Sequence, residues 1–426
     1  MLKNVKDAGL AKEGLAELEW ARMNMPLLAG IRKEFGKSKP FKGMQIGTCL
    51  HLEKKTGVLL EVLLAGGAKV SAASCNPLTT DDRVAAALLK EGADVHAWAG
   101  ETQREYYANI QKVVARAPQL VIDDGCDLIF ALHKDAGRLR SVVGACEETT
   151  TGILRLKAMQ KDGALKFPVI AVNDAHSKFL FDNRYGTAQS VVDAVARATN
   201  KLIAGKTVVV VGYGWCGRGI ASRMKGLGAN VVVCELGGRL PSQESGPSGF
   251  HKGLEALYDG NRVMGIFEAA RIGDIFVTAT GIKSAIGKEH FRLMKDGAVL
   301  ANAGHFNNEI DTASLAGMAK SRREIKENVE MFTLGGGKRL FLLSEGRLVN
   351  LARPSGQGHP IEIMDASFAL QALSLRHIAM NARGMPAGVH SVPQKIDDRV
   401  AELALLSQGI RLGKPTRAQE KYSVAW

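Results

Sequence analysis

The sequence predicts an α/β protein built from two doubly wound parallel-sheet domains, one inserted into the other, with a short helical C-terminal tail. Two observations carry this prediction. Short apolar, β-branched segments alternate with stretches of helical periodicity, as in buried parallel sheets. In the middle of the chain, an apolar run at residues 208–211 leads directly into a glycine-rich turn, where a second sheet begins. At 426 residues the chain is long enough for two or three domains.

The first part of the outer domain is expected over residues 1–184. It opens with an amphipathic helix in which Leu10, Leu15 and Leu18 alternate with charged residues. A helix is expected over residues 54–64. Strands are expected over residues 44–50, 69–74, 93–98, 120–125, 141–146 and 168–174.

A helix at about residues 185–204 leads into the inserted domain, expected over residues 185–352. Its strands are expected over residues 208–211, 231–235, 274–281 and 298–304, and the Gly/Ser/Pro-rich segment 237–249 is typical of a surface loop. The chain then returns to the outer domain over residues 353–388, through an apolar helix at 365–380. Residues 389–426 are expected to form the tail, with an amphipathic helix over 396–406.

Composition favours a cytoplasmic enzyme with a small-molecule substrate. The net charge is +13, but the basic residues are dispersed and aromatic residues make up 6%, which argues against nucleic-acid binding. Neither a membrane-spanning run nor a signal-peptide core is visible. The six cysteines form no C-x-x-C pair, so we expect buried free thiols in a reducing compartment and no metal site.

The glycine-rich turn predicts a dinucleotide site. Gly212, Gly214 and Gly217 follow the apolar run at G-x-G-x-x-G spacing. The first glycine permits a tight turn, the second lets the backbone approach a pyrophosphate, and the third lets the helix pack on the strand. Glu235 ends the next strand, where a carboxylate can accept from the ribose 2′-hydroxyl and repel a 2′-phosphate. The cofactor is therefore predicted to be NAD.

Acidic and basic side chains follow several predicted strands, where α/β sheets bind ligands. Taken singly, most of these residues are typical helix caps or loop ion pairs, and we interpret Asp123, Asp127, Glu147 and Asp174 in that way. Carboxylates beside a lysine also provide the proton-transfer groups that chemistry next to a nicotinamide requires. The same loops also hold Asp124, Glu148, His176, Lys178, Asp182 and Asn183, and the whole set favours such a role more than any single residue does. His51 alone is more typical of a core imidazole, whereas His305 and His359 lie in glycine-flanked loops, where a packing role is less natural.

Several motifs in one order resemble S-adenosyl-L-homocysteine hydrolase. They are GYGxxGxG, EETTTG, VND…K…FDN, NAGHF…EID, EGRLVNL and GHP, and the resemblance covers about residues 40–412. It implies a tightly bound NAD that temporarily oxidises the ribose 3′-hydroxyl. The resulting ketone acidifies the neighbouring C4′–H, homocysteine leaves C5′, water adds, and the hydride returns. The resemblance also suggests a homotetramer.

The resemblance assigns a role to each candidate. Lys178, Asp182 and Glu148 would hold the ribose and take the 3′-hydroxyl proton, Asp124 would serve at C4′, and His51 and His305 would lie near C5′. His305 and Phe306 are similar to a pair that gates the entrance. The base side would be formed by Glu53, Lys55, Thr56 and His359. The NAD site would be formed by Thr149, Thr150, Thr151, Asn183, Asn350, Gly212, Gly214, Gly217, Gly219 and Glu235.

The chain departs from the family pattern at several points. Thr187 replaces a common cysteine, Leu236 and Gly237 replace an acidic contact and precede an insertion, and the loop NLARPSGQGHP is two residues longer than usual. The end KYSVAW lacks the tail that in many relatives reaches a neighbouring subunit's NAD.

The nucleobase remains open between adenine and hypoxanthine. Lys55 stands where the eukaryotic pattern has a glutamate, and a lysine can donate to the 6-oxo group of hypoxanthine. This favours S-inosyl-L-homocysteine as the alternative substrate. Glu53 offers an acceptor for adenine, but residues two apart on a helix point in different directions, so we expect only one of the two to reach the base.

Two other functions compete with a thioether hydrolase. An ordinary NAD-dependent dehydrogenase would release NADH, and it leaves EETTTG and the Lys178/Asp182 pair unexplained. A catalytically silent, nucleotide-binding regulatory paralogue is disfavoured because Asp124, Glu148 and His305 are intact.

Overall fold

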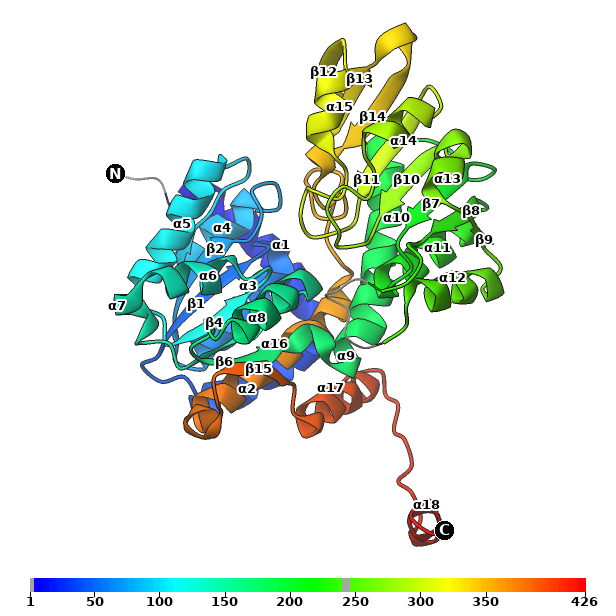
Figure 1. The fold of residues 1–426 in the computed structure, drawn as a ribbon. Helices are drawn as coiled ribbons and strands as arrows, with labels where there is room; N and C mark the ends of the chain where they lie inside the picture. Colours follow the sequence, from blue (N-terminus) through cyan, green and yellow to red (C-terminus); the bar gives the residue numbers. More distant parts are fainter. Residues whose placement is uncertain (1–3, 240–245) are drawn as a thin grey trace.

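The computed structural model describes residues 4–239 and 246–426, which form two α/β domains with a C-terminal segment apart from both (Figure 1). The first domain contains a wholly parallel sheet in the order β15-β6-β5-β4-β1-β2-β3. Its strands are β1 Gln45–Leu50, β2 Lys69–Ser74, β3 Asp94–His96, β4 Leu120–Asp123, β5 Gly144–Glu147, β6 Pro168–Ala171 and β15 Gly388–Ser391.

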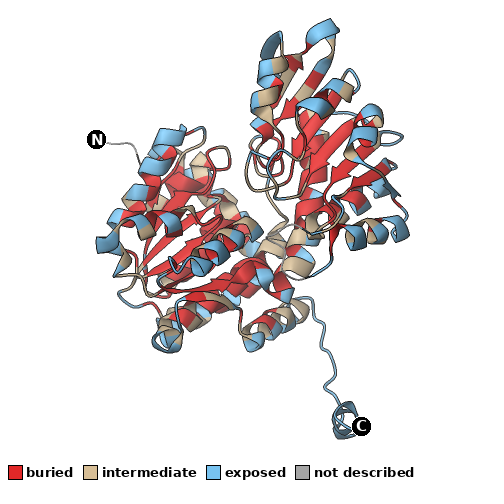
Figure 2. Ribbon diagram, viewed as in Figure 1, coloured by how far each residue is buried: buried red, intermediate tan, exposed pale blue. Residues whose placement is uncertain are grey.

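Helices cover both faces of this sheet, so most residues of its strands are buried (Figure 2). One face packs against α1 Ala11–Met23, α2 Pro26–Ser38, α3 Lys54–Ala65, α4 Asp82–Lys90 and α16 Ile361–Asn381. The other face packs against α5 Gln103–Ala115, α6 Asp127–Lys134 and α8 Thr150–Lys161, and the short α7 Ala136–Leu139 follows α6. The expected N-terminal helix is present, and the sequence analysis missed α2.

The second domain contains a sheet in the order β12-β13-β14-β11-β10-β7-β8-β9. Its strands are β7 Thr207–Val211, β8 Asn230–Cys234, β9 Arg262–Val263, β10 Ile275–Thr278, β11 Ala298–Asn302, β12 Ser321–Lys326, β13 Val329–Thr333 and β14 Arg339–Leu343. Its helices are α10 Thr187–Thr199, α11 Trp215–Gly226, α12 Gly249–Tyr258, α13 Ile266–Ile272, α14 Lys288–Leu293 and α15 Thr312–Met318. The loop expected over 237–249 ends where α12 begins, and residues 240–245 lie outside the described part of the chain.

The second sheet is not wholly parallel, which corrects the prediction. β12, β13 and β14 pair antiparallel, and only β14 continues the parallel order against β11. The sequence analysis did not assign these strands. All six residues of β12 are exposed, and it lies at the sheet edge, so it lacks the apolar run by which the buried strands were recognised.

The helix expected over 185–204 is shorter than predicted and has an unusual start. A π-helical turn, Phe179–Gly186, follows the short helix α9 His176–Lys178 and leads into α10. Helix α10 ends at Thr199 because Asn200 adopts a left-handed conformation, which asparagine tolerates. π-helical turns frequently occur at functional sites.

The chain returns to the first domain after the second is complete. Helix α16 packs against α2, α3, β4 and β5, strand β15 joins the sheet beside β6, and α17 Gln394–Ser407 packs against α2, α9 and α16. The tail expected over 389–426 is therefore shorter, because residues up to about 405 belong to the domain body. Residues 406–426, including α18 Arg417–Ser423, are all exposed.

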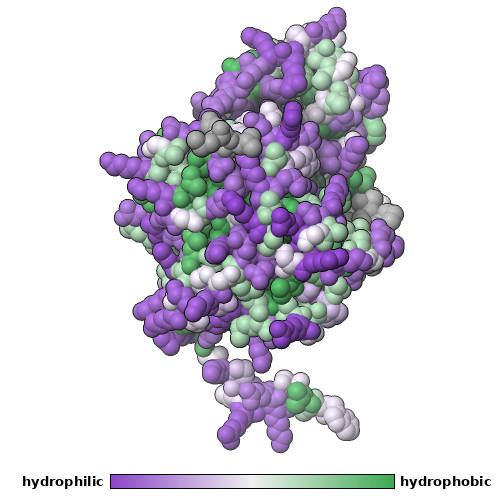
Figure 3. All heavy atoms as spheres, turned by 90° about the vertical axis from the view of Figure 1, so that its left-hand side faces the viewer, coloured by the Kyte–Doolittle hydropathy of each residue, from purple (hydrophilic) through white to green (hydrophobic). Residues whose placement is uncertain are grey.

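Surface and thiol chemistry agree with the composition. No helix in the described residues is long and apolar enough to cross a membrane. Hydrophilic side chains dominate the face shown in Figure 3, and apolar residues there form small groups. All six cysteines are free, and five are buried; Cys216 is partly exposed.

A carboxylate on α16 holds the start of α2, and its loss should destabilise the fold. Asp365 accepts from the backbone N–H groups of Leu27 and Leu28 at 2.8 and 2.9 Å. Burial raises the pKa of Asp365 to about 6, so the group is charged at pH 7.5. We expect Asp365→Ala to cost about 2–5 kcal/mol, because two buried donors lose their partner.

Thermal and urea unfolding at pH 7.5 measure this cost. Asp193→Ala is the matched control, since Asp193 only forms an exposed ion pair with Arg197, worth less than about 1 kcal/mol. Equal destabilisation by the two variants would contradict the role of Asp365.

Candidate active site

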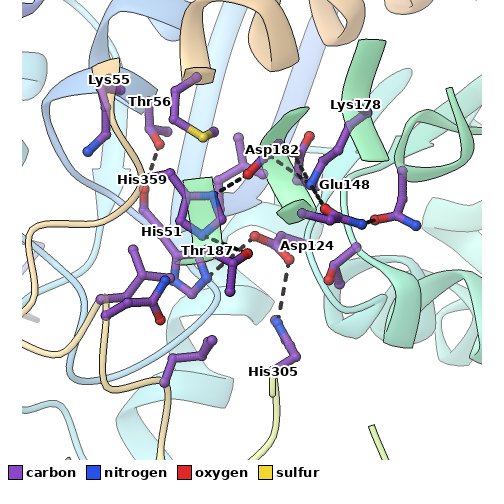
Figure 4. Close-up of a pocket in the computed structure, with 18 of the residues that line it drawn as sticks. His51, Lys55, Thr56, Asp124, Glu148, Lys178, Asp182, Thr187, His305 and His359 are labelled. Carbon is purple, nitrogen blue, oxygen red and sulfur yellow. Dashed lines mark hydrogen bonds and ion pairs between the residues drawn. The ribbon is translucent and has the colours of Figure 1, made fainter. Parts of the chain in front are cut away.

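A pocket between the two domains gathers most of the predicted site residues (Figure 4). The first domain contributes loops at the carboxyl ends of β1, β4, β5 and β6, the edge where α/β sheets bind ligands. The predicted residues that line the pocket are His51, Glu53, Lys55, Thr56, Asp124, Glu148, Thr149, Thr150, Lys178, Asp182, Asn183, His305, Asn350 and His359. Thr151, Gly212, Gly214, Gly217, Gly219 and Glu235 lie outside this lining.

Lys178 occupies the centre of a buried polar cluster. Its Nζ lies 2.9 Å from Asp182 Oδ2 and 3.3 Å from Glu148 Oε1, and it donates to Asn183 Oδ1 at 3.0 Å. Burial lowers the pKa of Lys178, but attraction to Asp182 and Glu148 outweighs burial and raises the pKa above its ordinary value. Lys178 is therefore a cation in the free enzyme.

The two carboxylates of this cluster differ in proton affinity. Burial raises the pKa of Glu148 despite Lys178 and the bonds that it accepts from Ser367 and Gln371. The pKa of Asp182 is held well below its ordinary value, because Lys178 and His359 outweigh burial. Glu148 is thus the carboxylate better suited to receive a proton from the lysine.

His359 lies beside the ribose-binding candidates. Its Nδ1 bonds to Asp182, and its Nε2 lies 3.4 Å from Thr187 Oγ1. The resemblance placed this histidine at the nucleobase. In the structure its side chain is engaged by Asp182 and Thr187, and the preceding Gly358 lies next to Lys55, so the role of His359 at the nucleobase stays a prediction.

Asp124 lies between two neutral imidazoles, near the middle of the close-up in Figure 4. Its carboxylate oxygens are each 3.5 Å from a ring nitrogen, His51 Nε2 on one side and His305 Nδ1 on the other. Burial lowers the pKa of His51 to about 4 and also lowers that of His305, in both cases against the attraction of Asp124. His51 Nδ1 is held by Thr79 Oγ1 at 2.9 Å. Two uncharged rings therefore flank one carboxylate.

Among the described residues, His51, Asp124 and His305 also form a group whose spacing could hold a metal ion. Their ligand atoms lie within 4.8 Å of one another. The sequence predicted no metal site. All three groups have a role in proton transfer in the function proposed below.

Lys55 and Glu53 meet in the structure, so the assumption that their side chains point in different directions is wrong, while the contact of either residue with the base stays a prediction. Glu53 is the N-cap of α3 and not a residue of the helix, so its side chain turns back toward Lys55. Lys55 Nζ lies 3.0 Å from Glu53 Oε2 and donates to Gln357 O at 2.9 Å. Lys55 is only 2% exposed. Thr56 Oγ1 donates to His51 O at 2.6 Å, which fixes the turn between β1 and α3.

Glu147 and Asp123 hold the loops that carry the reactive side chains. Glu147 Oε1 accepts from the backbone N–H groups of Gly125 and Thr149, both at 2.9 Å. Asp123 accepts from the N–H groups of Asp124 and Ile129 at 3.0 and 2.8 Å. Asp127 pairs with Arg155, and Asp174 pairs with Lys157 on the surface. The interpretation of these four acids as caps and loop ion pairs agrees with this geometry.

The glycine loop has the geometry that a dinucleotide needs. Gly212 has φ of +99°, and a Cβ on Gly217 would lie 1.9 Å from Gly212 O. A Cβ on Gly214 would meet no atom within 4 Å, so open space faces this residue. Helix α11 starts at Gly214 without a side-chain cap, and its N–H groups suit a pyrophosphate. Gly219 instead packs on the backbone of Arg184.

Other predicted cofactor residues offer polar atoms in the expected places. Glu235 accepts from the N–H of Tyr213 in the glycine loop. Asn350 donates to Ser190 Oγ at 3.1 Å, and its buried Oδ1 has no partner among the described residues, which suits the donor of a nicotinamide carboxamide. Thr151 Oγ1 is likewise buried without a described partner, and the methyl carbon Cγ2 of the same residue lies 4.0 Å from where a Cβ on Gly281 of the second domain would be. The residues present fit NAD.

Sequence reasoning missed several lining residues. Asn173 lies at the end of β6 and holds Asn183 through a 3.0 Å bond, while Phe368 and Met364 from α16 form an apolar wall. Ser367 and Gln371, which bond to Glu148, also come from α16. The apolar helix pattern of α16 predicted packing but gave no signal for these contacts.

Comparisons with known proteins agree with this site. Residues 3–138 match the model of S-adenosyl-L-homocysteine hydrolase, and residues 183–356 match the NAD-binding domain of that family. S-inosyl-L-homocysteine hydrolase of Methanocaldococcus jannaschii is 53% identical over 99% of this chain and 98% of its own length. Adenosylhomocysteinase of Sulfurisphaera tokodaii is 50% identical, with coverage of 99% and 98%, and that of Pyrococcus abyssi is 51% identical, with coverage of 99% and 97%. The chain is therefore an NAD-binding hydrolase of the S-adenosyl-L-homocysteine hydrolase family.

Proposed function

We propose that the protein catalyses the reversible hydrolysis of S-adenosyl-L-homocysteine to adenosine and L-homocysteine. The observation that carries this proposal is the arrangement of two proton-transfer clusters in one pocket. Lys178 with Glu148 and Asp182 forms one, and Asp124 with His51 and His305 forms the other. The reaction needs two such clusters because protons are moved at two places, at the 3′-hydroxyl during oxidation and at C4′ and C5′ during elimination.

The cofactor and the residues divide the chemistry. Bound NAD supplies a temporary hydride acceptor, which returns the hydride at the end of the cycle. Lys178 and its carboxylates hold the ribose hydroxyls, and Lys178 takes the 3′-hydroxyl proton. Since Lys178 is charged in the free enzyme, it must first pass its proton on, and Glu148 is the neighbour with the raised pKa. Substrate hydroxyls that enter between Lys178 and Asp182 weaken the attraction that keeps the ammonium charged.

The second cluster acts at C4′ and C5′. Once the 3′-carbon is a ketone, Asp124 with Lys178 removes the acidified C4′ proton, and the electron pair expels the homocysteine thiolate from C5′. A neutral imidazole of His51 or His305 can donate a proton to the thiolate and, by the same route, take one from the entering water. The net change is one thioether and one water converted into one nucleoside and one thiol.

Release of free thiol tests the proposed function. Purified protein, with its bound dinucleotide quantified, is mixed with S-adenosyl-L-homocysteine and with S-inosyl-L-homocysteine in separate assays. We expect thiol release over many turnovers with the dinucleotide unchanged at the end. NADH formed in stoichiometric amount with substrate would indicate an ordinary dehydrogenase, and binding without thiol release would indicate the silent regulatory paralogue.

S-inosyl-L-homocysteine is the second candidate substrate, and the Glu53–Lys55 pair can accommodate its base as well as adenine. Lys55 uses two of its three protons on Glu53 and Gln357, and the third remains for a ligand. Both contacts that Glu53 makes with Lys55 involve Oε2. Among the described residues no contact to Oε1 is seen, so this oxygen is left to accept a hydrogen bond from the base. With hypoxanthine, Lys55 would donate to O6 and Glu53 would accept from N1–H. With adenine, the order is reversed: Lys55 would donate to N1 and Glu53 would accept from the 6-amino group.

Lys55→Met distinguishes these two orders. If Lys55 donates to a 6-oxo group, we expect the variant to lower the ratio of kcat/KM for inosine over adenosine, in the synthetic direction, by roughly tenfold, the effect of one lost buried bond. Gln357→Ala is the matched control, because it removes a side chain while keeping the carbonyl that Lys55 contacts. An unchanged ratio in Lys55→Met would remove Lys55 from base recognition.

We also propose that the protein works as a homotetramer in the cytoplasm. Exposed apolar side chains support association: Phe250 and Tyr258 on α12 are 71% and 79% exposed, and Trp426 in the tail is fully exposed. Light scattering during size-exclusion chromatography measures the assembly.

A further inference from the structure

The guanidinium of Arg155 lies at the rim of the pocket, where the two domains touch, and the roles assigned above do not use it. Arg155 is on α8 of the first domain. Its Nη1 donates to Gly125 O at 2.5 Å and to Asp127 Oδ1 at 2.8 Å. Tyr106 donates to the other oxygen of Asp127 at 2.9 Å, so the guanidinium is fixed against the loop that carries Asp124.

The same guanidinium contacts the second domain. Its Cζ lies 5.9 Å from the ring centre of Phe306 and 5.5 Å from that of Phe130, distances at which a cation is attracted to an aromatic face. Phe306 belongs to the segment after β11, residues 303–306, whose backbone carbonyls at Gly304 and Phe306 are held by Asn302. Arg155 thus connects α8, the Asp124 loop and a segment of the other domain.

This contact bears directly on His305. The Phe306 ring packs edge-on against the His305 ring at 4.7 Å, and the His305 ring rests on Gly125, where a Cβ would lie 2.4 Å from its Nε2. His305 Nδ1 reaches Asp124 at only 3.5 Å, a weak contact on its own. The stacking of Arg155 on Phe306 is therefore a further interaction that keeps His305 over the pocket.

We propose that Arg155 is a positioning residue that latches residues 303–306 of the NAD-binding domain onto the Asp124 loop, and so keeps the oxidised nucleoside enclosed until it is reduced again. The inference rests on the proposed function for its catalytic consequence. If the segment swings away during the cycle, the ketone leaves, and the enzyme is left with a reduced dinucleotide and no partner to oxidise it. The latch therefore limits abortive turnover.

The experiment compares Arg155→Met, Phe306→Leu and the double variant with the unaltered protein. Lys157→Met is the matched control, because Lys157 is on the same helix and makes only an exposed pair with Asp174. Tyr106→Phe loosens Asp127 without removing the contact with Phe306, and so isolates the effect of the Asp127 network. Hydrogen–deuterium exchange of residues 303–307 reports the latch without any need for activity. Absorbance at 340 nm after turnover reports the enzyme left in the reduced state.

We expect Arg155→Met and Phe306→Leu each to increase exchange in residues 303–307 and to increase the reduced fraction per turnover by roughly tenfold, the range of one cation–π contact. The first reduction of NAD on mixing with nucleoside should stay within about twofold. The effect of the double variant should be smaller than the product of the two single effects, since both substitutions remove the shared contact between Arg155 and Phe306. Lys157→Met and Tyr106→Phe should stay near the unaltered protein.

The latch is overturned if Arg155→Met leaves exchange and the reduced fraction unchanged, or if the two substitutions multiply in the double variant. If Tyr106→Phe increases exchange and the reduced fraction as much as Arg155→Met does, both changes come from the Asp127 network, and the latch is also overturned. Failure of the unaltered protein to reduce its NAD with nucleoside would contradict the proposed function and the catalytic part of the inference, while the exchange data still decide whether the contact exists.

Discussion

Replacing Lys178 with methionine is expected to abolish oxidation of the nucleoside while the protein keeps its NAD. The ammonium contacts Glu148 and Asp182, which are assigned to the ribose, and of the assigned cofactor residues only Asn183, and it contacts no glycine of the dinucleotide loop. Removing a general base lowers the rate by roughly 10²- to 10⁴-fold. The absorbance change of bound NAD on mixing with nucleoside measures the step directly, and the dinucleotide released by heat measures retention of the cofactor.

Lys178→Arg separates charge from proton transfer. Arginine retains the positive charge between Asp182 and Glu148, but it does not lose its proton in proteins. We expect this variant to fold and bind nucleoside, yet to be as slow in oxidation as Lys178→Met. If arginine restores oxidation to near the normal rate, Lys178 serves only to hold charge, and another group is the base.

Gly217→Ala is expected to remove the bound cofactor. The added methyl group would lie 1.9 Å from Gly212 O, so α11 must move away from the end of β7. The N–H groups at the start of the helix then lose their places beside the phosphates. Loss of two buried bonds at about 1–3 kcal/mol each predicts an NAD affinity lower by roughly 100-fold or more. Calorimetric titration of the cofactor-stripped protein with NAD measures this change.

Gly226→Ala is the matched control for this substitution. Gly226 ends the same helix, and a Cβ there would meet no atom within 4 Å. This variant should bind NAD with normal affinity. Comparable losses in both variants would show that the effect comes from α11 stability and not from the contact with Gly212.

The parts of the fold that were predicted correctly are those encoded by neighbouring residues. The run at 208–211, the glycine turn and Glu235 together define one strand-turn-helix-strand unit, and the structure forms it as β7, α11 and β8. Most strands in the cores of the parallel sheets have a continuous apolar signature, and those strands were found. The exposed strand β12 has no such signature and was missed, but β14, which is apolar, and β15, which joins the parallel sheet of the first domain, were missed as well.

The site was predictable where a family motif fixes it and unpredictable where contacts join distant residues. Lys178, Asp182 and Asn183 are close in sequence, and they meet as expected. Arg155 meets Phe306 through tertiary packing across two domains, and no spacing rule relates these positions. The assumption that the side chains of Glu53 and Lys55 diverge was wrong because it placed both residues in the helix, whereas Glu53 precedes it.

The return of the chain to the first domain also determines the order in which the protein can fold during synthesis. The ribosome makes β1–β6 first, and α1–α4 can cover part of one face of their sheet, but the part of that face over β4 and β5 stays uncovered until α16 emerges, and the edge beside β6 stays open until β15 follows. The NAD-binding domain is continuous in sequence, so it can fold after β6 has been made and before α16 emerges. Apolar strand residues of the nascent first domain therefore stay exposed while some 200 residues are translated. At about 5–20 residues per second, this takes roughly 10–40 s, and we expect chaperones to protect the chain during this time.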